Sequence, residues 1–156
     1  MFPKLKRPHK ALSKEECLAI LQTQRRGVLS VLGEDGYPYG MPMDHYYCPE
    51  DGCLYFHSGK AGHKIDALHR CDKASYCVLD DGTPQPGHWA LIFRSVIAFG
   101  RITPVEDPGF AICRRLSRRF TDDEAYIDAE IRRFGPATLV LRFQIEDLCG
   151  KWVEES

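Results

Sequence analysis

LYFHSGKAGHKIDAL, residues 54–68, is the stretch of sequence from which we predict the fold. Residues 54–56 are apolar and predict a short strand, which the small and polar residues 57–59 interrupt. Beyond this interruption, Ile65 and Leu68 have the spacing of the apolar face of a helix. The stretch therefore predicts a strand that leads through a tight connection into an amphipathic helix.

The connection between this strand and this helix has the chemistry of a phosphate site. Free backbone N–H groups and the positive end of the helix dipole favour an anion at the start of a helix. Cationic side chains and a hydroxyl donor stand at the same place in the sequence, namely Ser58, Lys60, His63 and Lys64. An ordinary strand-to-helix connection with solvated lysines explains the same composition equally well.

Length and composition place the chain among ordinary globular proteins. A chain of 156 residues can bury a core, and we expect a single domain over residues 1–156. The hydrophobic content is 44% and the net charge is −1, so no overall charge attracts nucleic acid or an anionic membrane. No stretch approaches the roughly 20 apolar residues of a membrane-spanning helix. Residues 1–10 are basic and contain no apolar signal region, which argues against secretion.

The cysteines favour a reducing compartment. The chain has seven of them, an odd number, and Cys17, Cys77 and Cys113 lie within apolar runs. A small disulfide-stabilised scaffold would show an even and loop-rich pattern. We therefore expect reduced, mostly buried thiols in a cytoplasmic protein.

The order of the predicted elements favours an antiparallel barrel. Capping patterns begin helices at Ser13 and Thr121, and Asp107-Pro108 begins another between them. Apolar and β-branched runs predict six strands, at residues 28–32, 37–47, 53–57, 74–79, 89–103 and 137–145. These strands lack the regular alternation with helices that a doubly wound sheet requires. We therefore predict a mainly β fold with peripheral helices, a six-stranded antiparallel barrel.

Two of the predicted strands carry local irregularities. Pro38 and Pro42 cannot donate to a ladder, so one side of the strand at 37–47 must be an edge or face something other than a strand. That leaves the backbone of residues 40–43 free to meet a ligand. Gly100 predicts a bulge or a bend in the strand at 89–103.

His45, Cys48, Cys53 and His57 flank the turn between two predicted strands. Two histidines and two cysteines can bind zinc tetrahedrally. However, zinc motifs usually show tighter and duplicated spacing, and the sequence does not determine which way the two histidines face. Ordinary strand cysteines are therefore the default interpretation, and a zinc-binding structural module is the weaker one.

The arginines leave more than one interpretation open. Arg94 stands alone in an apolar run, either with its head group at the surface or in contact with an anion or the edge of a flavin. Residues 114–115 and 118–119 form a basic helix face, which we expect to be solvated or paired with acids rather than bound to nucleic acid. Rossmann, P-loop and serine-hydrolase motifs are absent, so those three chemistries lack support.

Four strings in the chain resemble one family in their order and spacing. They are RGVLSVLGEDGYPYGMPMDHYY, LYFHSGKAGHKIDAL, FRSVIAFGRI and CGKW. Together they resemble the flavin-binding split barrels that are similar to pyridoxamine 5′-phosphate oxidase. The branch named for nitroimidazole resistance is the most similar, and the likeness extends over residues 13–152.

The resemblance implies a six-stranded split barrel that forms a homodimer, with one FMN at each end of the subunit interface. It implies that residues 40–44 run beside the isoalloxazine ring and that residues 57–64 hold the phosphate. The second subunit then contributes the strand at 94–96 and a tryptophan. The implied cofactor-binding residues are Met41, Pro42, Met43, Asp44, His57, Ser58, Lys60, His63, Lys64, Arg94, Ser95 and Trp152. His57 or His45 is the candidate proton donor or nitro-group contact, because both stand at strand ends near the implied ring.

The resemblance also implies an activity, that of an FMN-dependent oxidoreductase. Such a protein takes electrons from a reduced nicotinamide or another source and reduces a small acceptor, for example a nitroaromatic. The chain lacks the arginine and histidine pattern that pyridoxamine phosphate oxidases carry near the C-terminus, which argues against vitamin B6 oxidation. The alternative is a non-enzymatic protein that holds flavin or haem, because six histidines leave room for an axial ligand.

Overall fold

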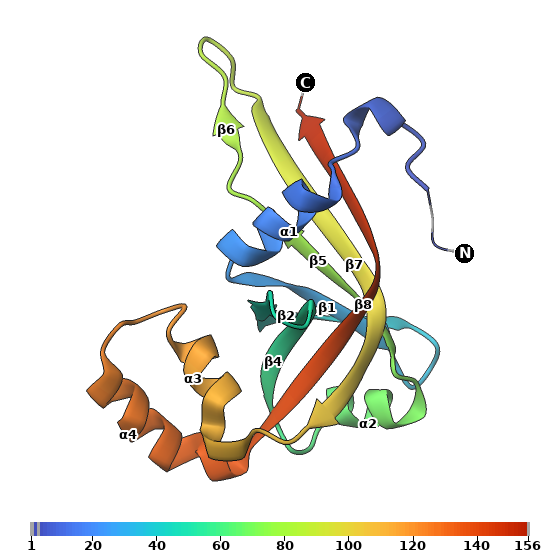
Figure 1. The fold of residues 1–156 in the computed structure, drawn as a ribbon. Helices are drawn as coiled ribbons and strands as arrows, with labels where there is room; N and C mark the ends of the chain where they lie inside the picture. Colours follow the sequence, from blue (N-terminus) through green and yellow to red (C-terminus); the bar gives the residue numbers. More distant parts are fainter. Residues whose placement is uncertain (1, 3, 156) are drawn as a thin grey trace.

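The computed structural model describes Phe2 and residues 4–155 as a curled antiparallel sheet with helices at its periphery (Figure 1). The strands are β1 (Arg26–Leu32), β2 (Pro38–Asp44), β3 (Tyr46–Cys48), β4 (Cys53–Gly59), β5 (Lys73–Leu79), β6 (Thr83–Pro84), β7 (Leu91–Val105) and β8 (Thr138–Glu154). Their order in the sheet is β2-β1-β5-β7-β8-β4-β3, and β6 pairs with β7. The predicted fold class, a mainly β antiparallel barrel with peripheral helices, is confirmed.

The helices cover the ends and one side of the sheet. They are α1 (Lys14–Thr23), α2 (His63–Arg70), α3 (Ala111–Ser117) and α4 (Glu124–Phe134), with short 3-10 turns η1 (Pro8–Lys10), η2 (Pro108–Phe110) and η3 (Gly135–Ala137). The predicted capping box begins α1, where Ser13 and Glu16 each accept the backbone N–H of the other. Figure 1 shows the α3–α4 pair at the opposite end of the molecule from η1. Within the described chain, no helix combines the length and the apolarity that a membrane crossing requires.

The strand predicted at 37–47 divides at His45. On one side of this residue β2 pairs with β1, and on the other side β3 pairs with β4. Because β2 and β3 stand at the two ends of the sheet order, this turn carries the chain from one end of the sheet to the other and curls it. The division, together with the two-residue β6, accounts for eight strands where the sequence predicts six.

The long β7–β8 ladder extends beyond the strand predicted at 137–145. β8 continues to Glu154, so the tail after residue 145 belongs to the sheet. The register of the ladder shifts between Phe99 and Gly100, where a side chain would collide with the carbonyl oxygen of Gln144. The predicted irregularity at Gly100 is confirmed.

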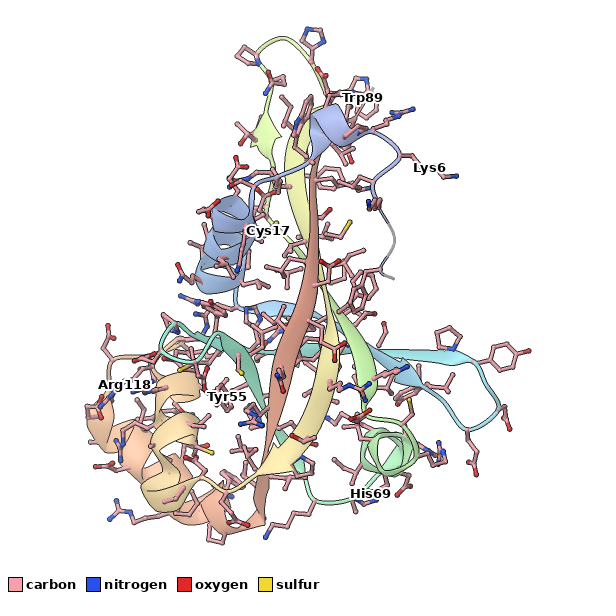
Figure 2. The ribbon with its side chains drawn as sticks, turned by 45° about the vertical axis from the view of Figure 1, so that its right-hand side comes forward. Lys6, Cys17, Tyr55, His69, Trp89 and Arg118 are labelled. Atoms are coloured by element: carbon pink, nitrogen blue, oxygen red, sulfur yellow. The ribbon has the colours of Figure 1, made fainter. Side chains whose placement is uncertain are left out.

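Apolar side chains fill the barrel, and a smaller cluster lies outside it. Inside, the ring of Phe56 packs edge-on against Tyr76 with 4.9 Å between centroids. α1 closes one side of the barrel, and Figure 2 shows Cys17 between this helix and β8. Outside the barrel, β4 packs against α3 through a cluster of Cys48, Cys53, Tyr55, Cys113 and Val140. All seven cysteines are free.

His45, at the division between β2 and β3, is fully buried and hydrogen-bonded on both sides. Its Nε2 lies 2.7 Å from the carbonyl oxygen of Leu21 in α1, and its Nδ1 lies 2.8 Å from the hydroxyl of Tyr76 in β5. A carbonyl only accepts hydrogen bonds, so Nε2 carries the proton and donates to Leu21. The Tyr76 hydroxyl donates its single proton to the backbone carbonyl of Met43 at 2.7 Å, and its oxygen lies against Nδ1 of the neutral ring. Burial lowers the pKa of His45 to about 4, which keeps the ring neutral near pH 7.

We expect acid to destabilise the fold through His45. Its pKa of about 4 lies below the ordinary value of 6.5, so the unfolded chain binds the proton more tightly than the folded protein does. The stabilisation is therefore complete above pH 6.5 and is lost as the pH falls towards and below 4, to a total of about 3 kcal/mol.

His45→Gln keeps a donor and an acceptor but cannot titrate. In urea unfolding at a series of pH values across this window, the variant should lose less stability than the wild type. Equal pH dependence in the two proteins would contradict a neutral, stabilising His45.

Candidate functional site

The hydrogen bonds at the two ends of β2 show which of its residues face β1. The carbonyl of Tyr37 accepts the N–H of Gly33 at 2.8 Å, and the N–H of His45 donates to the carbonyl of Arg25 at 3.0 Å. Both bonds point to the side occupied by β1. Because backbone polar groups alternate in direction along a strand, the odd-numbered residues of β2 face β1 and the even-numbered ones face away from it.

The outward side of β2 is an open edge. β2 stands at one end of the sheet order, and Pro38 and Pro42 lie at outward positions, so neither proline costs a ladder bond. The predicted edge is thus confirmed. Its outward N–H donors belong to Gly40 and Asp44. Gly40 is absent from the predicted binding residues, although the two prolines on either side of it mark its N–H as the free one.

The connection from β4 to α2 lies beside this edge. The Nζ of Lys64 lies 3.3 Å from the Sδ of Met43, so the predicted phosphate site and the predicted ring site are in contact. Lys64 is half-buried, which lowers its pKa, and none of the described residues forms a salt bridge with it. A partly desolvated ammonium group without a counter-ion favours an anionic ligand.

The start of α2 adds backbone donors and further cations. Gly62 precedes the helix at φ +123°, a conformation that side chains disfavour, and no side chain caps the first turn. His63 is exposed, 6.3 Å from the ring of Tyr39 between centroids. Lys60 donates to the carbonyl of Pro136 at 2.7 Å, which ties the connection to η3. Ser58 is half-buried at the end of β4.

His57 opens onto a groove between β4 and the α3–α4 pair. Two cavities of 260 and 220 Å³ lie there, and His57, Ser117 and Glu130 line both of them. The smaller cavity reaches Asp44 at the end of β2, whose carboxylate pairs with Arg26 at 2.6 Å. The rest of the lining is largely apolar and aromatic, with Leu116, Phe120, Tyr126, Ile127 and Phe134.

The structure separates the two predicted catalytic histidines. His45 is in the core with both ring nitrogens occupied, whereas His57 is exposed and available to a ligand. The zinc interpretation also finds no site, because no group of three or more His, Cys, Asp or Glu residues in the described chain is arranged to hold a metal ion. Cys48 and Cys53 instead lie opposite each other in the β3–β4 ladder.

Arg94, Ser95 and Trp152 lie away from this site, because they stand near the far end of the β7–β8 ladder from Thr138, which pairs with Gly59 just before α2. Arg94 stands opposite Trp152 in the β7–β8 ladder, and its exposed head group pairs with Asp80 at 2.8 Å. Ser95 is buried. A single chain therefore does not bring these three residues to the β4–α2 connection.

The basic helix face is largely paired with acids, as expected. Arg114 and Arg118 both pair with Glu124. Arg119 differs, because its guanidinium donates to the carbonyls of Gln22 and Gln24 at the C-terminal end of α1. These hydrogen bonds connect the end of α3 to the end of α1.

The fold and the edge site define a class, an antiparallel barrel with an open strand edge beside a cationic strand-to-helix connection. A family model described as pyridoxamine 5′-phosphate oxidase matches residues 13–152, and the chain belongs to this family. A search among curated proteins found no match.

Solved structures share this split-barrel fold. A candidate 5-nitroimidazole antibiotic resistance protein from Bacteroides thetaiotaomicron is 19% identical, with a TM-score of 0.75 over 92% of this chain and 87% of that chain. An FAD-binding protein from Mesorhizobium loti is 24% identical, with a TM-score of 0.66 over 92% and 97%. An FAD and heme binding protein from Mycobacterium smegmatis is 21% identical, with a TM-score of 0.71 over 91% and 72%. At these identities the similarity shows a common fold.

Proposed function

We propose that the protein is an FMN-dependent oxidoreductase that takes electrons from a reduced nicotinamide or another donor and reduces a small, nitroaromatic acceptor. The observation that carries this proposal is the contact between Lys64 and Met43, which joins an anion site to an open strand edge. A flavin mononucleotide has the matching chemistry, a phosphate at one end and a polar ring edge at the other. Similar folds described as FAD-binding support a flavin, and the one described for nitroimidazole resistance supports the acceptor.

Different residues of the chain would bind the phosphate and the ring of the flavin. Lys60, His63 and Lys64 neutralise the phosphate, and Ser58 donates a hydrogen bond to it. The outward N–H groups of β2 meet the ring edge, alongside residues 41–44. When bound, the flavin would supply the electron or hydride transfer, while the protein supplies position and electrostatics.

The groove at His57 is the proposed acceptor site. Its apolar and aromatic walls suit a flat ring, and the polar side chains that line both cavities are His57, Ser117 and Glu130. Asp44 belongs both to this groove and to the β2 edge, so an acceptor in the groove would lie next to a ring along that edge. His57 then holds the proton that the reduced acceptor takes up.

A second copy of the chain completes the proposed flavin site. Val28, Leu32 and Leu79 expose 45%, 49% and 55% of their surface on the face of the sheet that points away from the core. A hollow of 510 Å³ lies on the same part of the sheet. Burial of this face in a homodimer would remove apolar surface from water, and it would supply Arg94, Ser95 and Trp152 from the partner subunit.

A non-enzymatic flavin or haem carrier is the second candidate, favoured by the similar fold that is described as binding both FAD and heme. The absorption spectrum of the purified protein separates flavin bands from a Soret band. Steady-state turnover then separates an enzyme, which reoxidises many times per flavin, from a carrier.

We expect the double variant Lys60→Ala/Lys64→Ala to bind FMN about 10–100-fold more weakly than the wild type, because two charge-assisted contacts are lost. Riboflavin lacks the phosphate, so its affinity should change little. Lys14→Ala, on the exposed first turn of α1, serves as the matched control. Titration by flavin fluorescence quenching measures all of these affinities. An equal loss for FMN and riboflavin would contradict the phosphate assignment.

We expect His57→Ala to retain FMN and to lose about 10²-fold in kcat for a nitroaromatic acceptor, because it removes the proposed proton donor. His57→Gln keeps a hydrogen-bond donor but no titratable proton, so it should remain nearly as slow. Steady-state kinetics and the flavin content of each variant test this expectation. A variant that keeps both FMN and the full rate would exclude His57 from the mechanism.

We expect Leu79→Asp to shift the protein from dimer to monomer and to weaken FMN binding in parallel, because a charge enters an apolar interface. Phe134→Asp, on α4, replaces a similarly exposed apolar residue on another face and should remain dimeric. It controls for the oligomeric state alone, because Phe134 also lines the proposed acceptor groove. Analytical ultracentrifugation gives the oligomeric state. A dimeric Leu79→Asp variant would place the interface elsewhere.

A further inference from the structure

The basic N-terminal arm of the chain, residues 4–12, is held against the end of β8. The N–H of Leu12 donates to the carbonyl of Gly150 at 3.0 Å, and Ala11 forms an antiparallel bridge with Lys151. η1 precedes these contacts and turns the arm back along the last residues of the strand. Figure 1 shows the arm beside the C-terminal end of β8, and Figure 2 places Lys6 at the opposite end of the molecule from His69 and Arg118.

A cavity of 310 Å³ lies between this arm and β8. Its cationic lining residues are Lys6, Arg7, Lys10 and Lys151, and Glu154 is its only carboxylate among the described residues. None of these four cations forms a salt bridge within the described chain. The net charge of the whole chain is −1, so the cluster of four cations in this cavity does not follow from an excess of positive charge in the protein as a whole.

The same cavity has an aromatic wall. Trp152 lines it, and the Nζ of Lys10 lies 4.6 Å from the centre of the indole ring. This cation lies over one face of the indole ring, so a flat ligand stacks on the other face or displaces Lys10 from this one. Arginine and lysine side chains supply the donors that phosphate oxygens accept, and Arg7 can do so in bidentate fashion.

We propose that this cavity, which we call the arm site, binds a nucleoside diphosphate group, with its base against Trp152 and its phosphates among the four cations. The volume lies at the lower end of the range for small-molecule sites, roughly 300–1,000 Å³. A lone phosphate would leave the aromatic wall unused, and an uncharged aromatic ligand would leave the cations unneutralised. The arm site lies apart from the cations of the β4–α2 connection, but it shares Trp152 with the flavin site proposed for the dimer, so the test uses protein freed of FMN.

Tryptophan fluorescence tests this proposal directly, because the chain has two tryptophans. Trp89 is 81% exposed in a loop, so Trp89→Phe leaves Trp152 as the single reporter. In this background, ADP should quench the fluorescence saturably and should bind more weakly as salt increases. Adenosine and inorganic phosphate, added separately, should each bind at least about tenfold more weakly than ADP.

Variants separate the arm site from general charge effects. Lys10→Ala and Lys151→Ala should each weaken ADP binding about 5–10-fold, because each removes one charge-assisted contact. Lys4→Ala removes an exposed cation of the same arm that does not line the cavity, so it should leave the affinity unchanged. Absence of saturable quenching by ADP, equal binding of adenosine, or equal losses in Lys4→Ala and Lys151→Ala would overturn the proposal.

Competition identifies the source of the nucleotide. If NADPH or FAD displaces ADP, the arm site holds the adenylate half of a dinucleotide. If neither displaces ADP, its ligand is a free nucleotide. In FMN-free protein the titration reads the arm site alone, so its outcome does not depend on whether FMN binds at the β4–α2 connection.

Discussion

A neutral, fully buried imidazole holds several elements of this protein at one point. His45 donates to the last turn of α1 and contacts the hydroxyl of Tyr76 of β5, whose ring packs against Phe56 of β4. The same tyrosine hydroxyl lies 2.7 Å from the backbone carbonyl of Met43 in β2. Buried polar groups destabilise a fold strongly when they lose their partners, so this network specifies a single arrangement of helix and strands.

The open edge of the barrel follows from that constraint. His45 lies in the core at the point where β2 ends its pairing with β1 and β3 begins its pairing with β4. β2 is thereby left at an end of the sheet, where its outward donors have no strand partner and its prolines cost nothing. Met43 faces the barrel interior from this strand and meets Lys64 of α2. The interaction that closes the fold thus also positions the candidate ligand site.

The length of β7 and β8 sets the other constraint on the site. A strand of 17 residues extends over roughly 55 Å, so residues at its two ends cannot meet within one chain. This is why Trp152, near the end of β8, lies far from Thr138, which stands opposite Gly59 at its start. A flavin site that uses both ends needs two copies of the chain. The arm site needs only one, because η1 and the end of β8 are adjacent.

Local patterns in the sequence were sufficient for the fold class, the capping box at Ser13, the edge character of the strand with Pro38 and Pro42, and the irregularity at Gly100. Each of these depends on propensities or backbone chemistry that act over a few residues. The sequence also brought residues 58–64 together as a candidate anion site, because they are contiguous. Only the tertiary structure decided the roles of the histidines, since burial and hydrogen-bond partners from α1 and β5 separate His45 from the exposed His57. The tertiary structure also places Lys64 against Met43 and forms the cavity between the N-terminal arm and β8. These contacts join residues far apart in the chain, and no local pattern encodes such distances.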